Sequence, residues 1–510
     1  MALSLSNRDQ SSGHLFYNRR LRAATTRFSV RMKHDDRKQT AALMLSMVLV
    51  CIGVGWMLFL NYLKPQGIAG NSSIIGDRDT GALYARIDGK LRPAQTLVSA
   101  ELAVGQPGTV TWVKSAEVDK YPRGPMVGIP GSPAAMIVNR GAPSAWAVCD
   151  TAGEARSGDK TVVTAIAGPL SRFGRASVMA ADSGVLASFD GGTYVIWGGK
   201  RSQFDPAVRA VGASLGIDPG VTSPVAMSRA LFDALPATEP LQVPTIPLAG
   251  QDSKWLPGTA VGTVLQVQTV GSGTQFYVLL GDGVQKISGF VADLLRSANS
   301  YGAAAPRQVS PDLLGSVPQV STLAVDNYPQ GRLKFLDTVA NPTTCVGWEK
   351  STGDPQARVS VYNGRGLPVS PGMDQRIVSL VRDDRDPSSV EADQVLMLPG
   401  ATNFVSSTSA VIDARSRESL FWVSNEGVRF GIAGDDKTVQ ALGINPAQAQ
   451  QAPWPLLRVW AAGPELSRAA ALRERDTVPT GGTVRELPAS TAPNAPPAPA
   501  PVDVAGGGRR

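Results

Sequence analysis

The chain has 510 residues and carries 49 Lys and Arg side chains against 42 Asp and Glu, a formal net charge of +7. Residues 1–38 hold nine of the basic and three of the acidic side chains, a net charge of +6, so the remaining residues carry only +1. Because the basic excess belongs to one short tail, the charge does not indicate a nucleic-acid partner. The 53 glycines and 38 prolines favour many turns and short strands over long helices.

Both histidines, His14 and His34, lie in the same basic tail. Residues 35–510 therefore lack the usual general base of Ser-His-Asp and Cys-His enzymes, and they lack the commonest zinc ligand.

An uncharged stretch of 25 residues, 39–63, follows the tail. About 20 apolar residues in a helix cross a bilayer core, so this stretch is long enough to span a membrane with modest tilt. Trp56, Phe59 and Tyr62 cluster near its C-terminal end, as interfacial aromatic residues do. The alternatives are a cleaved signal peptide and a buried core helix; the long basic lead and the length of the apolar run disfavour both.

The basic flank orients this span, because positively charged segments stay on the cytoplasmic side. We therefore expect residues 1–38 to form a cytoplasmic basic tail, 39–63 a transmembrane helix and 64–476 an exported domain. Residues 477–510 are rich in Pro and Ala and cannot bury a core, so we expect a disordered exported tail there.

Two cysteines belong to the expected exported part, Cys149 in WAVCD and Cys345 in TTCVGW, whereas Cys51 lies in the span. Both stand in short apolar contexts that predict buried strands, and these strands are candidates for a shared central layer. In an oxidising compartment an isolated pair favours a disulfide. Two unpaired buried thiols are the alternative, and a two-cysteine metal site is less favoured than either.

A hairpin motif recurs four times, with an aromatic and apolar strand, a Gly-containing turn and a return strand. The copies begin at Tyr84 (YARIDGKLRPAQTL), Tyr194 (YVIWGGKRSQFD), Phe276 (FYVLLGDGVQKI) and Phe421 (FWVSNEGVRFGI). Two of them continue to similar endings, ASLGIDP and ALGINP, at nearly equal spacing. We therefore predict an α+β fold in which one N-terminal transmembrane helix precedes an elongated exported domain with a central β core and four degenerate α/β repeat modules.

No motif predicts a catalytic, cofactor-binding or metal-binding residue. The two Gly-Lys dipeptides end at Lys90 and Lys200; each has tyrosine where a phosphate-binding loop needs its first glycine, and neither lysine is followed by Ser or Thr. Residues 212–216 match the nucleophile-elbow pattern G-x-S-x-G, but no histidine follows Ser214.

The cytoplasmic tail contains more aromatic residues than membrane orientation requires. We predict that it touches anionic lipid and also docks a cytoplasmic partner subunit. The predicted docking residues are Phe16, Tyr17, Arg19, Arg20 and Phe28. A basic segment that only sets the orientation is the alternative.

Several long segments are those of a known family: GHLFYNRR (13–20), DRDTGALYARI (77–87), PRGPMVGIPGSP (122–133), WAVCD (146–150) and LSRAAALRERDTVP (466–479). Through them the chain resembles the EccB component of the mycobacterial ESX, or type VII, secretion system. The resemblance covers nearly the whole chain except the proline-rich end.

This resemblance implies a structural core subunit of a secretion complex with EccC, EccD and EccE, single-pass in the cell inner membrane, without a cofactor. It implies a periplasmic domain that links copies of the chain, a central β core flanked by four repeats, and a disulfide between Cys149 and Cys345. Members of the family are often labelled ATPases; we expect ATP hydrolysis to belong to EccC. An exported cell-envelope hydrolase or a peptidoglycan-binding protein is the alternative.

Overall fold

The computed structural model of the protein describes residues 8–28, 33–63, 67–139, 143–153, 161–217, 223–269, 271, 273–381 and 390–478. The chain divides into an N-terminal unit, made of residues 1–71, 77–80 and 111–120, and a main unit made of residues 72–76, 81–110 and 121–510. All but the first two residues of the predicted tail at 477–510 lie outside the described residues.

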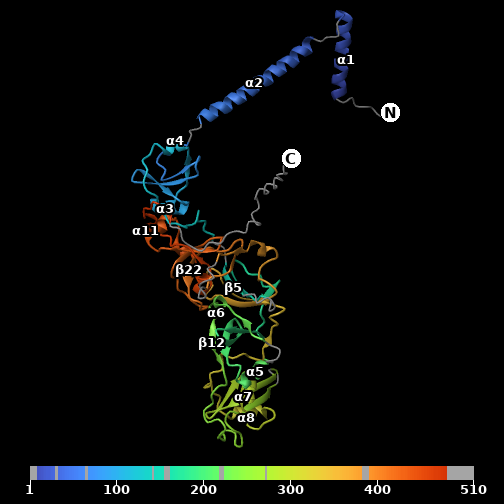
Figure 1. The fold of residues 1–510 in the computed structure, drawn as a ribbon. Coiled ribbons are helices and arrows are strands. Elements are labelled where there is room, and N and C mark those ends of the chain that lie inside the picture. The colour runs from blue at the N-terminus through green and yellow to red at the C-terminus, as the bar shows by residue number, and fades with distance from the viewer. Residues whose placement is uncertain are drawn as a thin grey trace, which may run out of the picture. The chain divides into compact units, whose positions relative to one another are not determined.

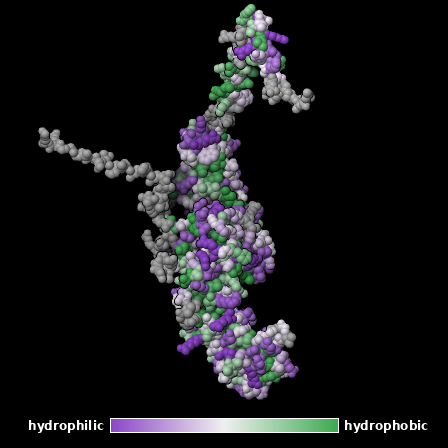
Figure 2. Space-filling model, turned by 90° about the vertical axis from the view of Figure 1, so that its right-hand side faces the viewer, coloured by the Kyte–Doolittle hydropathy of each residue, from purple (hydrophilic) through white to green (hydrophobic). Residues whose placement is uncertain are grey.

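Two long helices belong to the N-terminal unit, α1 (Arg8–Arg27) and α2 (Lys33–Leu63) (Figure 1). Within α2, Thr40–Phe59 is long and apolar enough to cross a membrane, and none of this stretch is buried. Figure 2 shows it as a largely green surface. The apolar stretch thus lies inside a longer helix, because the charged residues that precede it are also compatible with helical backbone.

The N-terminal unit also contains β4 (Thr111–Val113) and α4 (Ser115–Val118). The Ser115 hydroxyl donates to the Asp77 carboxylate at 2.8 Å, and the Ser115 amide donates to Asp79 at 3.0 Å. These contacts hold the segment 77–80 against the start of α4.

The main unit contains four modules and a central sheet, whose elements have the following bounds. Module 1 has β1 (Ile74–Asp77), whose last residue is counted with the N-terminal unit, β2 (Leu83–Ile87), β3 (Lys90–Ala94) and α3 (Leu97–Val104). Module 2 has β8 (Ser183–Phe189), β9 (Gly192–Trp197), β10 (Lys200–Phe204), α5 (Arg209–Leu215), β11 (Val225–Ala226), α6 (Arg229–Ala234) and β12 (Ala237–Leu241). Module 3 has β13 (Val264–Thr269), β14 (Gly273–Leu279), β15 (Val284–Ile287), α7 (Gly289–Ala298), β16 (Arg307–Val309) and α8 (Pro311–Gly315).

Module 4 and the central sheet complete the main unit. Module 4 has β22 (Phe404–Thr408), β23 (Leu420–Val423), β24 (Val428–Ile432), α9 (Asp436–Ala441), η2 (Pro446–Gln448), β25 (Gln450–Pro453), α10 (Trp454–Leu457), β26 (Ala461–Ala462) and α11 (Arg468–Ala471). The central elements are β5 (Ser144–Thr151), β6 (Val162–Ala167), β7 (Ala176–Val178), β18 (Thr343–Lys350), β19 (Arg358–Gly364), η1 (Met373–Arg376), β20 (Val378–Ser379) and β21 (Gln394–Met397). The short strand β17 (Lys334–Phe335) pairs with β8.

All four modules share one chain order. Three antiparallel strands lead into a helix, and in modules 2, 3 and 4 a short strand then returns parallel to the first strand of the module. The predicted hairpins are β2–β3, β9–β10, β14–β15 and β23–β24. The prediction of four repeats is therefore confirmed, and each repeat is longer than the hairpin that indicated it.

The similar endings ASLGIDP and ALGINP lie at the ends of corresponding helices, α5 and α9. Gly216 has a φ of 77° directly after α5, and Gly443 has a φ of 61° just beyond α9. Glycine is favoured at such left-handed positions because it has no Cβ. The shared glycine thus marks the end of the same helix in two modules.

The two cysteine strands, β5 and β18, lie next to each other in the central sheet, which has the order β20-β21-β6-β5-β18-β19-β7. Cys149 stands directly opposite Cys345, with a Cα–Cα distance of 4.0 Å, and a disulfide joins them. Both side chains are fully buried. The predicted central layer and the pairing of these cysteines are confirmed.

The modules pack in two pairs. One apolar core is shared by modules 1 and 4, where α3 lies against α9 and α11. Figure 1 shows α3 and α11 next to each other. A second core is shared by modules 2 and 3, where α5 packs on α7. A third core joins one face of the central sheet, through Trp146 and Trp348, to modules 2 and 4, and its largest side chains include Trp460. The first module therefore pairs with the last, and the second with the third.

We predict that Cys149→Ser and Cys345→Ser lower the stability equally, because either change opens the same bond. The bond closes a loop of 196 residues, which the chain-entropy model values at about 5 kcal/mol. Urea unfolding of the full chain in detergent measures the loss, and the double variant should match either single one. Cys51→Ser is the control and should leave the midpoint unchanged; unequal losses in the two single variants would contradict the prediction.

Candidate functional site

The predicted docking residues of the tail all lie on or just after α1. Phe16, Tyr17, Arg19 and Arg20 belong to the helix, and Phe28 follows its end with a φ of 50°. The side chains are solvent-exposed; Phe28 is 97% exposed and Tyr17 61%.

Four of these residues lie on one face of α1. Arg19 and Arg20 stand three and four residues after Phe16, and Arg20 stands three residues after Tyr17, so these positions are neighbours on the helix surface. Phe28 lies beyond the last turn. The helix therefore carries Phe16 and Tyr17 on the same exposed face as Arg19 and Arg20, whereas Phe28 lies beyond it.

The two Gly-Lys dipeptides lie in hairpins, which agrees with their interpretation as part of the repeat. Lys90 begins β3 and Lys200 begins β10, each directly after a tight turn that contains glycine at positive φ. A phosphate-binding loop instead connects a strand to the N-terminus of a helix. Ser214 of the G-x-S-x-G match lies buried in α5, where its hydroxyl donates to the Ala210 carbonyl at 2.8 Å.

One polar contact recurs at the same place in three modules. Arg201 is the second residue of β10 and donates its Nε to the Phe232 carbonyl at 2.9 Å. Arg429 is the second residue of β24 and donates its Nε to the Trp460 carbonyl at 3.1 Å. Gln285, at the same position of β15, donates to a main-chain carbonyl at 2.7 Å. In each module this side chain ties the return strand to the segment that follows.

Asp150 is a buried carboxylate next to the disulfide. It accepts hydrogen bonds of 2.6 Å from both the amide and the hydroxyl of Ser228, which caps the N-terminus of α6. Burial raises the pKa of Asp150 from its ordinary value of 3.8 to about 6, although the bonds from Ser228 act in the opposite direction. Asp150 thus connects the central sheet to module 2.

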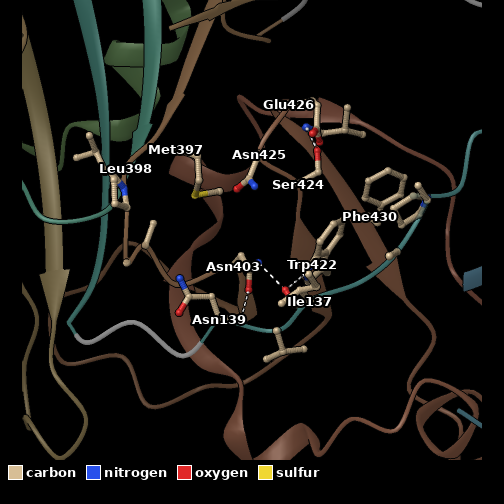
Figure 3. Close-up of a pocket in the computed structure, with 18 of the residues that line it drawn as sticks. Ile137, Asn139, Met397, Leu398, Asn403, Trp422, Ser424, Asn425, Glu426 and Phe430 are labelled. Carbon is tan, nitrogen blue, oxygen red and sulfur yellow. Dashed lines mark hydrogen bonds between the residues drawn. The ribbon is translucent and has the colours of Figure 1, made fainter. Parts of the chain in front are cut away.

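The cavity drawn in Figure 3 has a volume of about 690 Å³ and lies against module 4. One wall is the extended segment 134–139. The Asn403 side chain holds this segment with two hydrogen bonds. Its Nδ2 donates to the Ile137 carbonyl at 2.9 Å, and its Oδ1 accepts from the main-chain N–H of Asn139 at 2.7 Å. The Trp422 indole also donates to the Ile137 carbonyl, at 3.1 Å.

Sequence reasoning did not find these polar residues. Asp150 carried one usable signal, since a carboxylate inside an apolar strand needs a buried partner. The contact between Asn403 and Ile137 joins positions 266 residues apart, and no local pattern could indicate it.

The comparison with known families decides the identity. A family model described as "Type VII secretion system ESX-1, transport TM domain B" matches residues 3–480. This chain belongs to the EccB family. The family assignment made from the sequence is therefore confirmed.

Relatives and solved structures agree with it. "ESX-2 secretion system ATPase EccB2" of Mycobacterium tuberculosis (strain ATCC 25618 / H37Rv) is 72% identical over 484 residues, which cover 95% of this chain and 98% of that protein. A chain of an intact ESX-5 inner membrane complex is 38% identical, with a TM-score of 0.74 over 96% of this chain and 99% of that one. The EccB3 dimer from the ESX-3 core complex matches at 34% identity and a TM-score of 0.69, over 79% of this chain and 100% of that one.

We predict that Asp150→Asn removes the contribution of Asp150 to the pH dependence of stability. Asp150 binds its proton more tightly in the folded state, so its stabilising contribution is complete below pH 3.8 and is lost as the pH rises through about 6. The difference in free energy of unfolding between the unchanged protein and the variant should therefore fall by about 3 kcal/mol from about pH 3 to about pH 7.

Urea unfolding at both pH values measures this difference. Asp282→Asn, at an exposed turn, is the control and should leave the pH dependence of the free energy of unfolding unchanged. A difference between Asp150 and its Asn variant that stays constant with pH would refute the assignment.

Proposed function

We propose that this chain is a structural core subunit of an ESX inner-membrane secretion complex, where it assembles with EccC, EccD and EccE. The observation that carries the proposal is the match over nearly the whole chain to a subunit of the intact ESX-5 inner membrane complex. In such a complex the chain would scaffold the other subunits for protein export.

We propose that the chain serves an ESX-2 system. Identity to the ESX-2 protein of M. tuberculosis is 72%, whereas identity to the ESX-5 subunit of the solved complex is 38%. A difference of this size supports descent within the ESX-2 lineage.

For the topology, we propose a single pass through the cell inner membrane. Residues 1–38, with a net charge of +6, would stay cytoplasmic, 39–63 would span the bilayer, and 64–476 with the tail 477–510 would be periplasmic. The candidate span at Thr40–Phe59 supports this arrangement.

On the cytoplasmic side, we assign partner docking to α1. Its aromatic residues are exposed and bordered by arginines, which suits a protein partner and an anionic lipid surface together. On the periplasmic side, the modules would hold neighbouring copies of the chain together, as the match to the EccB3 dimer supports.

We assign ATP hydrolysis in the complex to EccC. The ESX-2 relative carries the word ATPase in its name, but both Gly-Lys dipeptides of this chain lie at hairpin turns. Measurement of ATP turnover by the purified full chain tests the assignment, and robust ATP turnover would refute it. Robust muropeptide turnover by the same preparation would instead favour the alternative of a cell-envelope hydrolase over a structural subunit.

Topology generates one prediction. A periplasmic reporter such as alkaline phosphatase, fused after Asp476, should be active, and the same reporter inserted near Ser12 should be inactive. A cytoplasmic reporter at the two places should give the reverse pattern. If alkaline phosphatase is active at Ser12, the proposed orientation is wrong.

The proposed docking of a partner by α1 leads to a second prediction. Replacing Phe16, Tyr17 and Phe28 with Ala while keeping every arginine should leave membrane insertion intact but weaken recovery of the complex, because buried aromatic residues carry much of the energy at such contacts. Affinity purification in mild detergent, with quantification of the co-purified subunits, measures the effect, and we expect a loss of about tenfold.

The control is Phe173→Ala, since Phe173 is 83% exposed but belongs to the main unit. It should assemble normally. If the triple variant also assembles and secretes normally, α1 serves only to orient the chain.

A further inference from the structure

The cavity against module 4 combines polar and apolar walls. Its floor contains Trp422 and Phe430, and Met397, Leu398 and Ile137 supply further apolar surface (Figure 3). Glu426 and Arg376 contribute one charge of each sign to the lining. The site therefore has no net charge to attract a charged ligand.

One wall already shows how this site binds extended backbone. The Asn403 amide pairs with the main chain at Ile137 and Asn139, donating to one residue and accepting from the other. A primary amide that donates and accepts at the same time matches the alternating C=O and N–H groups of an extended chain.

Two further amides of the same kind line the cavity with their side chains free. Asn425 points into it from the turn between β23 and β24, and Asn139 lies on the opposite side in Figure 3. Within the described residues, neither side-chain amide makes a hydrogen bond. Both side chains are exposed, so they can bind a ligand without breaking an existing contact.

The aromatic residues of the floor disfavour a sugar polymer. Trp422 is 6% exposed and Phe430 is 4% exposed, so neither offers an open ring face on which a sugar could stack. Ile137, which is 76% exposed, and the partly buried Met397 instead offer an apolar surface suited to small aliphatic side chains.

From these features we infer that the cavity binds a second extended peptide segment, uncharged and with small aliphatic side chains, whose backbone pairs with the Asn139 and Asn425 amides. The peptide would lie along the wall that residues 134–139 form. The site belongs to the main unit and is independent of the docking function of α1, so failure of either proposal leaves the other standing.

The test uses the full-length chain in detergent and a fluorescein-labelled hexapeptide of alternating serine and valine, acetylated and amidated at its ends. Fluorescence polarisation should show saturable binding. Asn139→Ala and Asn425→Ala should each weaken binding about fivefold, because each removes the hydrogen bonds between one side-chain amide and the peptide backbone. Asn71→Ala is the control, because Asn71 is also exposed but lies outside the cavity.

A second measurement does not depend on the folding of any variant. The same hexapeptide with alternate backbone amides N-methylated keeps its side chains but loses donors, and it should bind the unchanged protein about tenfold more weakly. Equal thermal midpoints of the unchanged protein and the Ala variants confirm that the variants are folded.

Three results would overturn the inference. The first is the absence of saturable binding of the hexapeptide to the unchanged protein. The second is an affinity that neither the double Asn variant nor N-methylation lowers. The third is displacement of the peptide by a tetrasaccharide of N-acetylglucosamine at lower concentration than by unlabelled peptide, which would assign the cavity to a glycan.

Discussion

The pairing of β5 with β18 is the contact on which the rest of the main unit depends. It sets Cys149 opposite Cys345 and Trp146 opposite Trp348. The two cysteines face one apolar core and the two tryptophans face another. If one strand slipped by one residue, its tryptophan would turn to the face that holds the disulfide, and its cysteine would turn to the face that holds the tryptophans. Burial on both faces therefore specifies the register, and the disulfide holds it.

Features defined within about 25 residues could be predicted from the sequence. An apolar strand and a glycine-containing turn indicated each hairpin, and the similar endings ASLGIDP and ALGINP indicated equivalent positions in two repeats. The second half of each repeat could not be predicted in the same way. β11 has two residues and β16 has three, which is too short for an alternating pattern to appear.

Contacts between distant segments escaped sequence reasoning for a different reason. Only the cysteines gave a chemical sign of long-range pairing, because a disulfide needs two identical partners. Asn403 carries no such sign, since a side-chain amide can pair with any main-chain N–H or C=O group. Asp150 indicates only that it needs a buried donor, and many donors would fit. The candidate cavity is built from contacts of this second kind, so it became visible only in three dimensions.

The pairing of module 1 with module 4 has a consequence for the order of folding. Modules 2 and 3 are neighbours in the chain, so in the proposed topology they can bury their shared core as soon as both have crossed the membrane. Module 1 crosses first but must wait for residues near the C-terminal end of the fold, since α9 and α11 cover its helix α3. Closing so long a loop is slow. With the proposed topology, the earliest segment to be exported would therefore be the last to have its apolar helix covered.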